Sequence, residues 1–289
     1  MSLSALSLVV LAALIHACWN LLAKRAAAIG PMFVFAYALC ATVLYLPLAI
    51  WSLTQGQMSW TLAALGCVVA SGALHLAYSL CLQRGYQVAD LSVVYPVARG
   101  TGPLLSSLGA FLLLGEPAHL STIAGVVCVV IGIFCIATQG QWARFAQPQA
   151  WVGVRWGAMT GLLIACYTVV DAYGVKVLLI APILLDWFGN ALRTSLLVPY
   201  AWRRGRAGWA SMRGYWWLAA AVGLLSPLSY ILVLQALSDG APLSLVAPAR
   251  EMSMMIGALL GMLVLGEKAS GWRLAGCAVL IAGVVLLGS

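Results

Sequence analysis

Charged residues are scarce in this chain of 289 residues: they make up 8% of it, whereas 64% of it is hydrophobic. A soluble domain carries about 25% charged residues, because its surface must face water. The mean hydropathy of +1.03 also shows that the chain is strongly apolar. A water-soluble globular protein is therefore excluded, and the outer surface is expected to face a lipid bilayer.

Sequence patterns of enzymes and metal sites are also missing. No H-E-x-x-H, Walker loop or G-x-S-x-G occurs, and the three histidines are scattered. The eight cysteines fall in apolar segments without a C-x-x-C pair, so neither disulfides nor a metal site is indicated. We expect no enzyme activity, no cofactor and no metal. Although the net charge is +8, the basic residues mostly flank apolar segments, so no nucleic acid partner is expected.

Long apolar segments are what the chain has instead. The first lacks a basic leader and is too long for a signal peptide, so we interpret it as a membrane helix. A spanning helix needs roughly 20 apolar residues, whereas the strands of a membrane barrel need only about ten. The sequence therefore predicts an all-α integral membrane protein without a soluble domain. The ten expected transmembrane helices cover residues 3–23, 31–51, 60–82, 91–114, 120–138, 156–176, 182–202, 216–237, 243–265 and 272–288.

The two halves of the chain resemble each other. LSVVYPVARGTGPLLSSLGAFLLLGE, from Leu91, aligns with LSLVAPAREMSMMIGALLGMLVLGE, from Leu243. The register continues into the next span, and the matching positions are Pro96 and Pro248, Arg99 and Arg250, Gly115-Glu116 and Gly266-Glu267, Ala124-Gly125 and Ala275-Gly276, and Gly132 and Gly283. We predict two five-helix repeats, residues 1–146 and 147–289, in one membrane domain. Because five is odd, the second repeat is inverted, an arrangement typical of secondary transporters.

Basic residues are unevenly distributed between the loops, in agreement with this inversion. Those after the odd-numbered spans hold Lys24, Arg25, Arg84, Arg144, Arg155, Arg203, Arg204, Arg206, Arg213, Lys268 and Arg273. The opposite side holds only Lys176. Arginine and lysine favour cytoplasmic loops. We therefore predict a bacterial inner-membrane protein with both termini on the periplasmic or extracellular side.

Several short motifs carry a family resemblance. Trp19-Asn20 is followed by Lys24, Gly-Glu ends spans four and nine, and A-G-x-x-x-x-x-x-G occurs in spans five and ten. Over essentially its whole length the chain resembles the drug/metabolite transporter superfamily, in particular EamA-type transporters. The resemblance implies transport of small metabolites, commonly export of amino acids, through a central cavity between the repeats. Many members look as though their termini are cytoplasmic, with basic residues at the start and after span two; this chain has neither.

Six ionisable residues lie inside the predicted spans: Arg99, Asp171, Asp186, Arg193, Arg250 and Glu251. Each costs at least ~2.5–3.5 kcal/mol at the centre of a bilayer, so each is expected to face a partner or a cavity. Their charges balance. Two interpretations stay open: they form ion pairs that fix helix packing, or some of them line a substrate or proton path.

Arg99 and Arg250 are the strongest candidates for substrate binding. Each follows a proline, which kinks a helix and exposes backbone polar groups. A guanidinium group matches the geometry of a carboxylate or phosphonate, so an anionic or zwitterionic substrate is favoured. Glu251 directly follows Arg250 and should point to another face of the helix.

Asp171 follows Tyr167 and Thr168 on span six and either exchanges protons or pairs with Arg193 or Arg99. Asp186 lies near the end of its span, where we expect it to be solvated. The expected substrate-binding residues are Trp19, Asn20, Tyr78, Tyr95, Arg99, Tyr167, Tyr230 and Arg250. The expected residues for proton coupling or ion pairing are His75, Asp171, Arg193 and Glu251.

Together these features predict a secondary transporter that exports amino acids or similar zwitterionic or anionic metabolites by alternating access. We expect a monomer or a weak homo-oligomer. Uptake of an organic anion such as a phosphonate, or multidrug efflux, is the alternative among transporters. An intramembrane enzyme that modifies lipids is the alternative of another class, but the sequence shows no reactive cluster for it.

Overall fold

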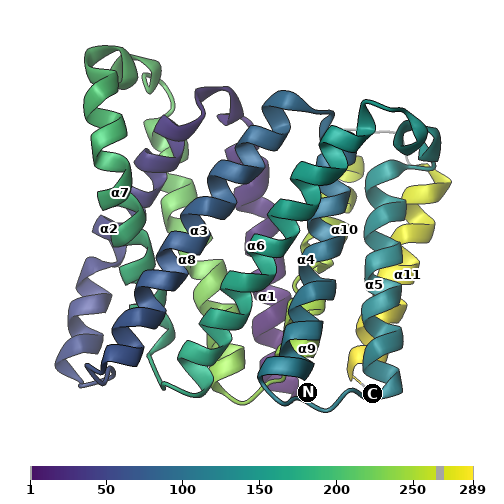
Figure 1. Ribbon diagram of the computed structural model, residues 1–289, viewed down its shortest axis with the longest axis horizontal. Helices are drawn as coiled ribbons and strands as arrows, with labels where there is room; N and C mark the ends of the chain where they lie inside the picture. Colours follow the sequence, from purple (N-terminus) through teal and green to yellow (C-terminus); the bar gives the residue numbers. More distant parts are fainter. Residues whose placement is uncertain (1, 265–269, 289) are drawn as a thin grey trace.

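The computed structural model describes residues 2–264 and 270–288, and these residues form an all-α bundle, as predicted (Figure 1). The α-helices are α1 (Leu3–Lys24), α2 (Pro31–Thr54), α3 (Leu62–Val88), α4 (Leu91–Leu113), α5 (Leu120–Thr138), α6 (Ala150–Lys176), α7 (Pro182–Ser211), α8 (Trp216–Ser238), α9 (Leu243–Ala249), α10 (Met252–Val264) and α11 (Gly271–Gly288). Two short 3₁₀ helices, Ala27–Ile29 and Trp142–Ala146, lie in the connections. Gly266, Glu267 and Lys268, used above for the repeat and the charge distribution, lie outside the described residues.

Each predicted span corresponds to a helix or, for span nine, to the pair α9 and α10. In the described part of the chain, eight segments are long and apolar enough to cross a membrane; α4 and α7 are not among them. These two helices carry polar residues of the site described below, and both run within the same bundle as their neighbours (Figure 1). Large apolar side chains such as Val43, Leu112 and Val285 are 59%, 72% and 65% exposed, which suits a surface in contact with lipid.

Span nine departs from the expected kinked helix, because it is divided into two helices at Arg250 and Glu251. Pro248 has no backbone N–H to donate and its ring obstructs the preceding turn. The backbone tightens there: the N–H of Glu251 donates to the carbonyl of Pro248, three residues back, at 3.0 Å. Its counterpart α4 contains Pro96 and Pro103 and still continues as one helix. The two halves therefore differ where their arginines lie.

Helix starts follow ordinary capping chemistry. Thr61 Oγ1 accepts a hydrogen bond from the N–H of Ala64 at the start of α3, and Asp90 Oδ1 accepts one from the N–H of Ser92 at the start of α4. The same hydrogen bond from the Ser92 N–H lowers the pKa of Asp90 from its ordinary value. Pro31 and Pro182 occupy first-turn positions of α2 and α7, where a missing N–H costs nothing.

The matching glycines of spans five and ten meet one another. A Cβ on Gly125 would lie 2.9 Å from the carbonyl oxygen of Gly283, and one on Gly132 would lie 2.8 Å from that of Gly276. Absence of side chains at these positions lets the backbones of α5 and α11 approach closely, as in other membrane helix pairs. α5 and α11 lie side by side at one end of the bundle (Figure 1).

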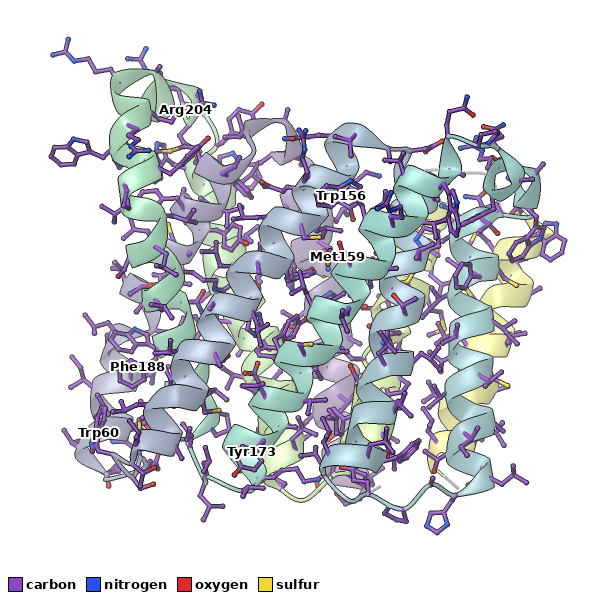
Figure 2. All side chains as sticks on the ribbon, viewed as in Figure 1. Trp60, Trp156, Met159, Tyr173, Phe188 and Arg204 are labelled. Atoms are coloured by element: carbon purple, nitrogen blue, oxygen red, sulfur yellow. The ribbon has the colours of Figure 1, made fainter. Side chains whose placement is uncertain are left out.

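Helix α1 begins and helix α11 ends on the same face of the bundle (Figure 1). The opposite face carries the end of α7, where Gly205 adopts φ +49° and redirects the chain; Arg204 projects there (Figure 2). Because both ends of the chain lie on one face, the chain crosses the membrane an even number of times in this arrangement. Which face is cytoplasmic stays a prediction from the charge distribution.

Candidate functional site

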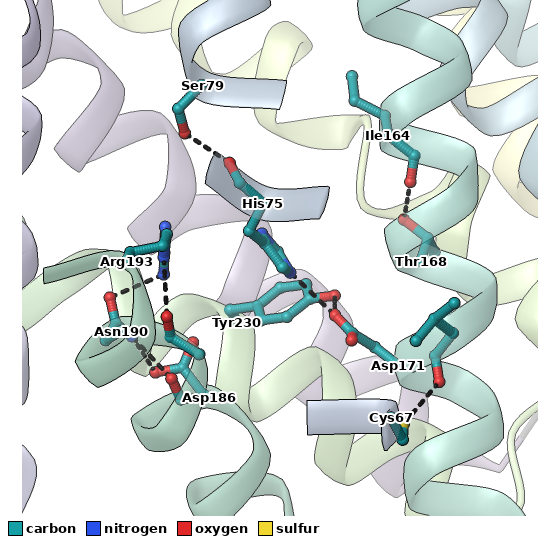
Figure 3. A network of polar contacts seen from close by, with 12 residues as sticks. Cys67, His75, Ser79, Ile164, Thr168, Asp171, Asp186, Asn190, Arg193 and Tyr230 are labelled. Carbon is teal, nitrogen blue, oxygen red and sulfur yellow. Dashed lines mark hydrogen bonds and ion pairs between the residues drawn. The ribbon is translucent and has the colours of Figure 1, made fainter. Parts of the chain in front are cut away.

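A polar cluster lies where α3, α6 and α8 meet in the middle of the bundle. His75 Nε2 lies 2.9 Å from Asp171 Oδ2, and the Tyr230 hydroxyl donates a hydrogen bond to the same oxygen at 2.5 Å (Figure 3). The Tyr167 ring stacks on His75 with a centroid distance of 3.9 Å, and Tyr78 lies against Tyr167 at 5.6 Å. Asp171 is 1% exposed, and its Oδ1 has no hydrogen-bond partner among the described residues. The partners of Asp171 are therefore a histidine and a tyrosine rather than the expected arginine.

A second polar cluster lies along α7. Asn190 Nδ2 donates to Asp186 Oδ2 at 2.8 Å, and Arg193 Nη2 donates to Asn190 Oδ1 at 2.7 Å (Figure 3). The sequence interpretation of Asp186 as solvated was wrong, because Asp186 is only 8% exposed. Its position one turn into α7 suggested the membrane surface, but α7 packs against α2, α3 and α8, which cover this turn.

A very small cavity of about 10 Å³ joins the two clusters. Its lining residues are Ser71, His75, Asp171, Leu185, Asp186, Gly189, Arg193 and Tyr230. Ligand pockets for metabolites usually measure about 300–1,000 Å³. In this conformation the cavity therefore suits water-sized species rather than a metabolite.

Arg99 on α4 is neutralised by an acid from the other half of the chain. Its Nη2 lies 2.8 Å from Glu251 Oε2 and donates to Ser253 Oγ at 3.1 Å. Arg99 is 8% exposed and Glu251 is 1% exposed, so this is a buried ion pair between α4 and the break in span nine. Ser253 had no sequence signal, since a serine on an apolar helix predicts nothing specific.

Arg250 occupies the matching position but has different surroundings. It is 4% exposed, and in the part of the chain that the structure describes its Nε has no hydrogen-bond partner. Within the described residues it forms no ion pair. Tyr167 and Tyr230 are within range of its charge, so it faces the aromatic cluster around Asp171. The charge of Glu251 also acts on Arg250, although the two form no ion pair in the described chain.

The other expected substrate residues are Trp19, Asn20 and Tyr95, which have separate surroundings. Trp19 packs edge-on against His16 at 4.8 Å, and its buried Nε1 has no hydrogen-bond partner within residues 2–264 and 270–288. The Asn20 side chain donates to the carbonyl of His16 on its own helix, which engages its amide. Tyr95 is half-buried, within range of the Arg99 and Glu251 charges. The structure thus brings Tyr78, Tyr95, Arg99, Tyr167, Tyr230 and Arg250 toward one central region.

A polar clasp at the end of α4 was not foreseen. Glu116 accepts hydrogen bonds from the N–H groups of Leu243 (2.6 Å) and Ser244 (2.9 Å), and from Lys176 Nζ (3.1 Å). It therefore connects the first half of the chain to α6 and to the start of α9. Burial raises the pKa of Glu116, but the N–H of Ser244 leads the donors that outweigh this effect and hold it below its ordinary value. The Gly-Glu motif and the isolated Lys176 were both visible in the sequence, but not their contact.

Comparison with known proteins agrees with this architecture. Residues 3–138 match the model of the EamA-like transporter family. This part of the chain, just under half of it, is thus similar to the EamA-like transporter family. The resemblance inferred from Trp19-Asn20 and the Gly-Glu motifs is thereby confirmed.

A solved crystal structure of another protein aligns with this EamA-like chain with a TM-score of 0.75 and 16% sequence identity. The alignment covers 99% of this chain and 96% of the other. At this identity the likeness concerns the fold alone. No curated protein matches the sequence. The protein is therefore a multi-pass membrane transporter of a family that is generally not enzymatic, with a small molecule as its substrate.

Proposed function

We propose that this EamA-like protein is a secondary transporter that exports amino acids or similar metabolites carrying a carboxylate. The observation that supports it most is Arg250, a buried guanidinium that forms no ion pair in the described residues and whose Nε has no hydrogen-bond partner among them. An intramembrane charge without a counter-ion is costly. A substrate carboxylate on Arg250 would supply the missing charge and accept its free N–H groups.

The groups around Arg250 favour a zwitterion over a simple anion. Across the aromatic cluster, Asp171 presents an unpartnered Oδ1, an acceptor suited to an ammonium group. Tyr167, Tyr230 and Tyr78 supply aromatic faces between the two charges. The expected site thus has a cationic end, an aromatic wall and an anionic end.

Access to this site requires the two halves to move, since Arg250 is 4% exposed. The packing of the helices supports an inverted repeat for this motion: α1 packs on α8, as its counterpart α6 packs on α3. The counterparts α2 and α7 pack on each other, and so do α5 and α11. Exchange of the two halves leaves this pattern unchanged, as a pseudo-two-fold axis in the membrane plane demands.

A thermal-shift screen of the purified protein tests the proposal. Amino acids, phosphonates and cationic drugs are compared, because a ligand that binds only the folded state raises its melting temperature. We expect stabilisation by one or more amino acids in wild type and none in Arg250→Gln. If only phosphonates stabilise the protein, the substrate is an organic anion and not an amino acid. Stabilisation by cationic drugs alone, unaffected by Arg250→Gln, would contradict the proposal.

A further inference from the structure

The cavity between α3, α6, α7 and α8 carries an unbalanced charge. Asp171 and Asp186 are both acidic, and Arg193 is the basic residue among its lining residues besides His75. With His75 neutral, the described lining residues sum to −1; the charge of Arg250 acts on His75 and Tyr230 from outside this lining. Such a charge is costly in a bilayer, at least ~2.5–3.5 kcal/mol per group on insertion scales. The uptake of one monovalent cation or one proton removes it.

The two carboxylates differ in how well they are stabilised as anions. Asp171 has His75 and the Tyr230 hydroxyl on one oxygen, at 2.9 and 2.5 Å. Asp186 receives a single side-chain hydrogen bond, from the neutral amide of Asn190 at 2.8 Å. The guanidinium of Arg193 binds Asn190 rather than Asp186, and no ion pair joins Asp186 to a base in the described chain. Asp186 is therefore the carboxylate that binds a proton more readily when the cavity is closed.

Other titratable groups around the two acids do not offer a better proton acceptor. They are His75 and Cys67 on α3, Tyr230 on α8, Tyr45 on α2 and Arg250 at the end of α9. Tyr45 donates its hydroxyl to the carbonyl of Leu224, and Cys67 donates its thiol to the carbonyl of Val170. His75 already contacts Asp171, so a proton on His75 would be shared with that carboxylate.

The geometry disfavours a metal cation as the occupant. Arg193 lines the same cavity and repels a second positive charge. A hard cation prefers several oxygen ligands, whereas the side-chain oxygens of this lining come from Ser71, Asp171, Asp186 and Tyr230, two of which already bond to each other. A proton needs one carboxylate oxygen only.

We propose that Asp186 is the proton-binding residue of this transporter, with the Asp171 carboxylate, held by neutral His75, as the charged group across the cavity. A proton from water adds to the Asp186 carboxylate and gives a neutral carboxylic acid when the cavity is closed; opening to water returns the proton. Only the coupling of this cycle to substrate movement rests on the proposed function. The protonation of Asp186 itself does not.

Infrared difference spectroscopy of the full chain in lipid nanodiscs tests the proton site without a substrate. Lowering the pH from about 8 to about 5 should produce the carbonyl absorption of a buried protonated carboxyl group. Asp186→Asn should abolish this signal and keep the melting temperature of wild type. The control Asp171→Asn should still give this signal, but only at a lower pH, because the loss of one negative charge makes Asp186 easier to ionise; Asp186→Glu should give the signal at a shifted position. A signal that survives in Asp186→Asn, or that disappears only in Asp171→Asn, would refute the assignment.

Two further experiments, one with sodium and one that measures transport, complete the test. If sodium chloride, compared with choline chloride, stabilises wild type but not Asp186→Asn, and no carboxyl signal appears, the site binds a metal cation and the proposal is wrong. With a ligand from the screen, transport by wild type in proteoliposomes should follow an imposed pH gradient, and Asp186→Asn should lose this dependence while binding the ligand. If the screen yields no ligand, the proposed substrate fails, but the infrared result still decides the proton site.

Discussion

Two buried arginines, Arg99 and Arg250, occupy matching positions in the sequence and unlike positions in the structure. Arg99 forms an ion pair with Glu251 at 2.8 Å, whereas Arg250 has none in the described residues. Removing one partner of a buried ion pair leaves the other charge uncompensated, which typically costs about 3–5 kcal/mol. Removing an unpaired charge does not. The two residues therefore serve as matched controls for each other.

We expect Arg250→Gln to weaken binding of a carboxylate ligand about tenfold to hundredfold, because a charge-assisted hydrogen bond contributes about 1.5–3 kcal/mol. Its melting temperature should not fall. Arg99→Gln should lower the melting temperature, and Glu251→Gln added to it should restore stability. Ligand titration and thermal unfolding of the three variants measure both effects. Equal loss of stability in Arg99→Gln and Arg250→Gln would show that Arg250 is also a structural residue.

The close contact between α5 and α11 depends on the glycines of spans five and ten. In Gly132→Leu, a side chain would be placed 2.8 Å from the backbone oxygen of Gly276 and from Leu280. Overpacking of this kind costs about 1–3 kcal/mol, so the variant should have a lower melting temperature. Gly66→Ala is the control, since nothing lies within 4 Å of a Cβ there. Unchanged stability of Gly132→Leu would mean that α5 and α11 do not pack closely in the membrane.

The clasp at Glu116 connects α4 to the start of α9 and should respond to pH. The pKa of Glu116 lies below its ordinary value, so its stabilising effect is present above the unfolded-state pKa of about 4.3 and is lost as the pH falls through the folded-state pKa. Glu116→Gln should therefore melt at a lower temperature than wild type near pH 7. Below pH of about 4 the difference should shrink, whereas a constant difference across this range would exclude a charged clasp.

The bundle as a whole brings the site together from both halves of the chain. His75 and Arg99 come from the first half, and Asp171, Asp186, Tyr230 and Glu251 come from the second. Relative motion of the halves would therefore change every contact of the site at once. Such a site suits alternating access, in which two repeats move about a central binding region.

The orientation of the bundle is predicted from its loops. Because the basic residues gather on the face opposite to both chain ends, we expect the termini outside the cytoplasm. A C-terminal fusion should then be active with alkaline phosphatase and dark with GFP. The reverse pattern would place the termini in the cytoplasm, as the sequences of many EamA-type proteins suggest.

Much of this protein follows from its sequence, because lipid imposes simple rules on a chain. Each crossing needs a long apolar segment, and internal satisfaction of backbone groups makes that segment a helix. The all-α fold, the approximate position of each helix and the family resemblance could therefore be predicted. The matched glycines Gly125, Gly132, Gly276 and Gly283 were visible as a motif, although not as contacts of each other.

Only the tertiary structure decided which charges meet. Helical spacing places residues on faces of one helix, but partners on different helices depend on the rotation and depth of each helix in the bundle. Asp171 thus contacts His75 and Tyr230 and not an arginine, and Asp186 is buried. In the alignment of the two halves, Arg99 and Arg250 occupy equivalent positions. The break at Pro248 placed Glu251 against Arg99 and left Arg250 unpaired within the described chain, because a proline interrupts span nine while α4 remains one helix.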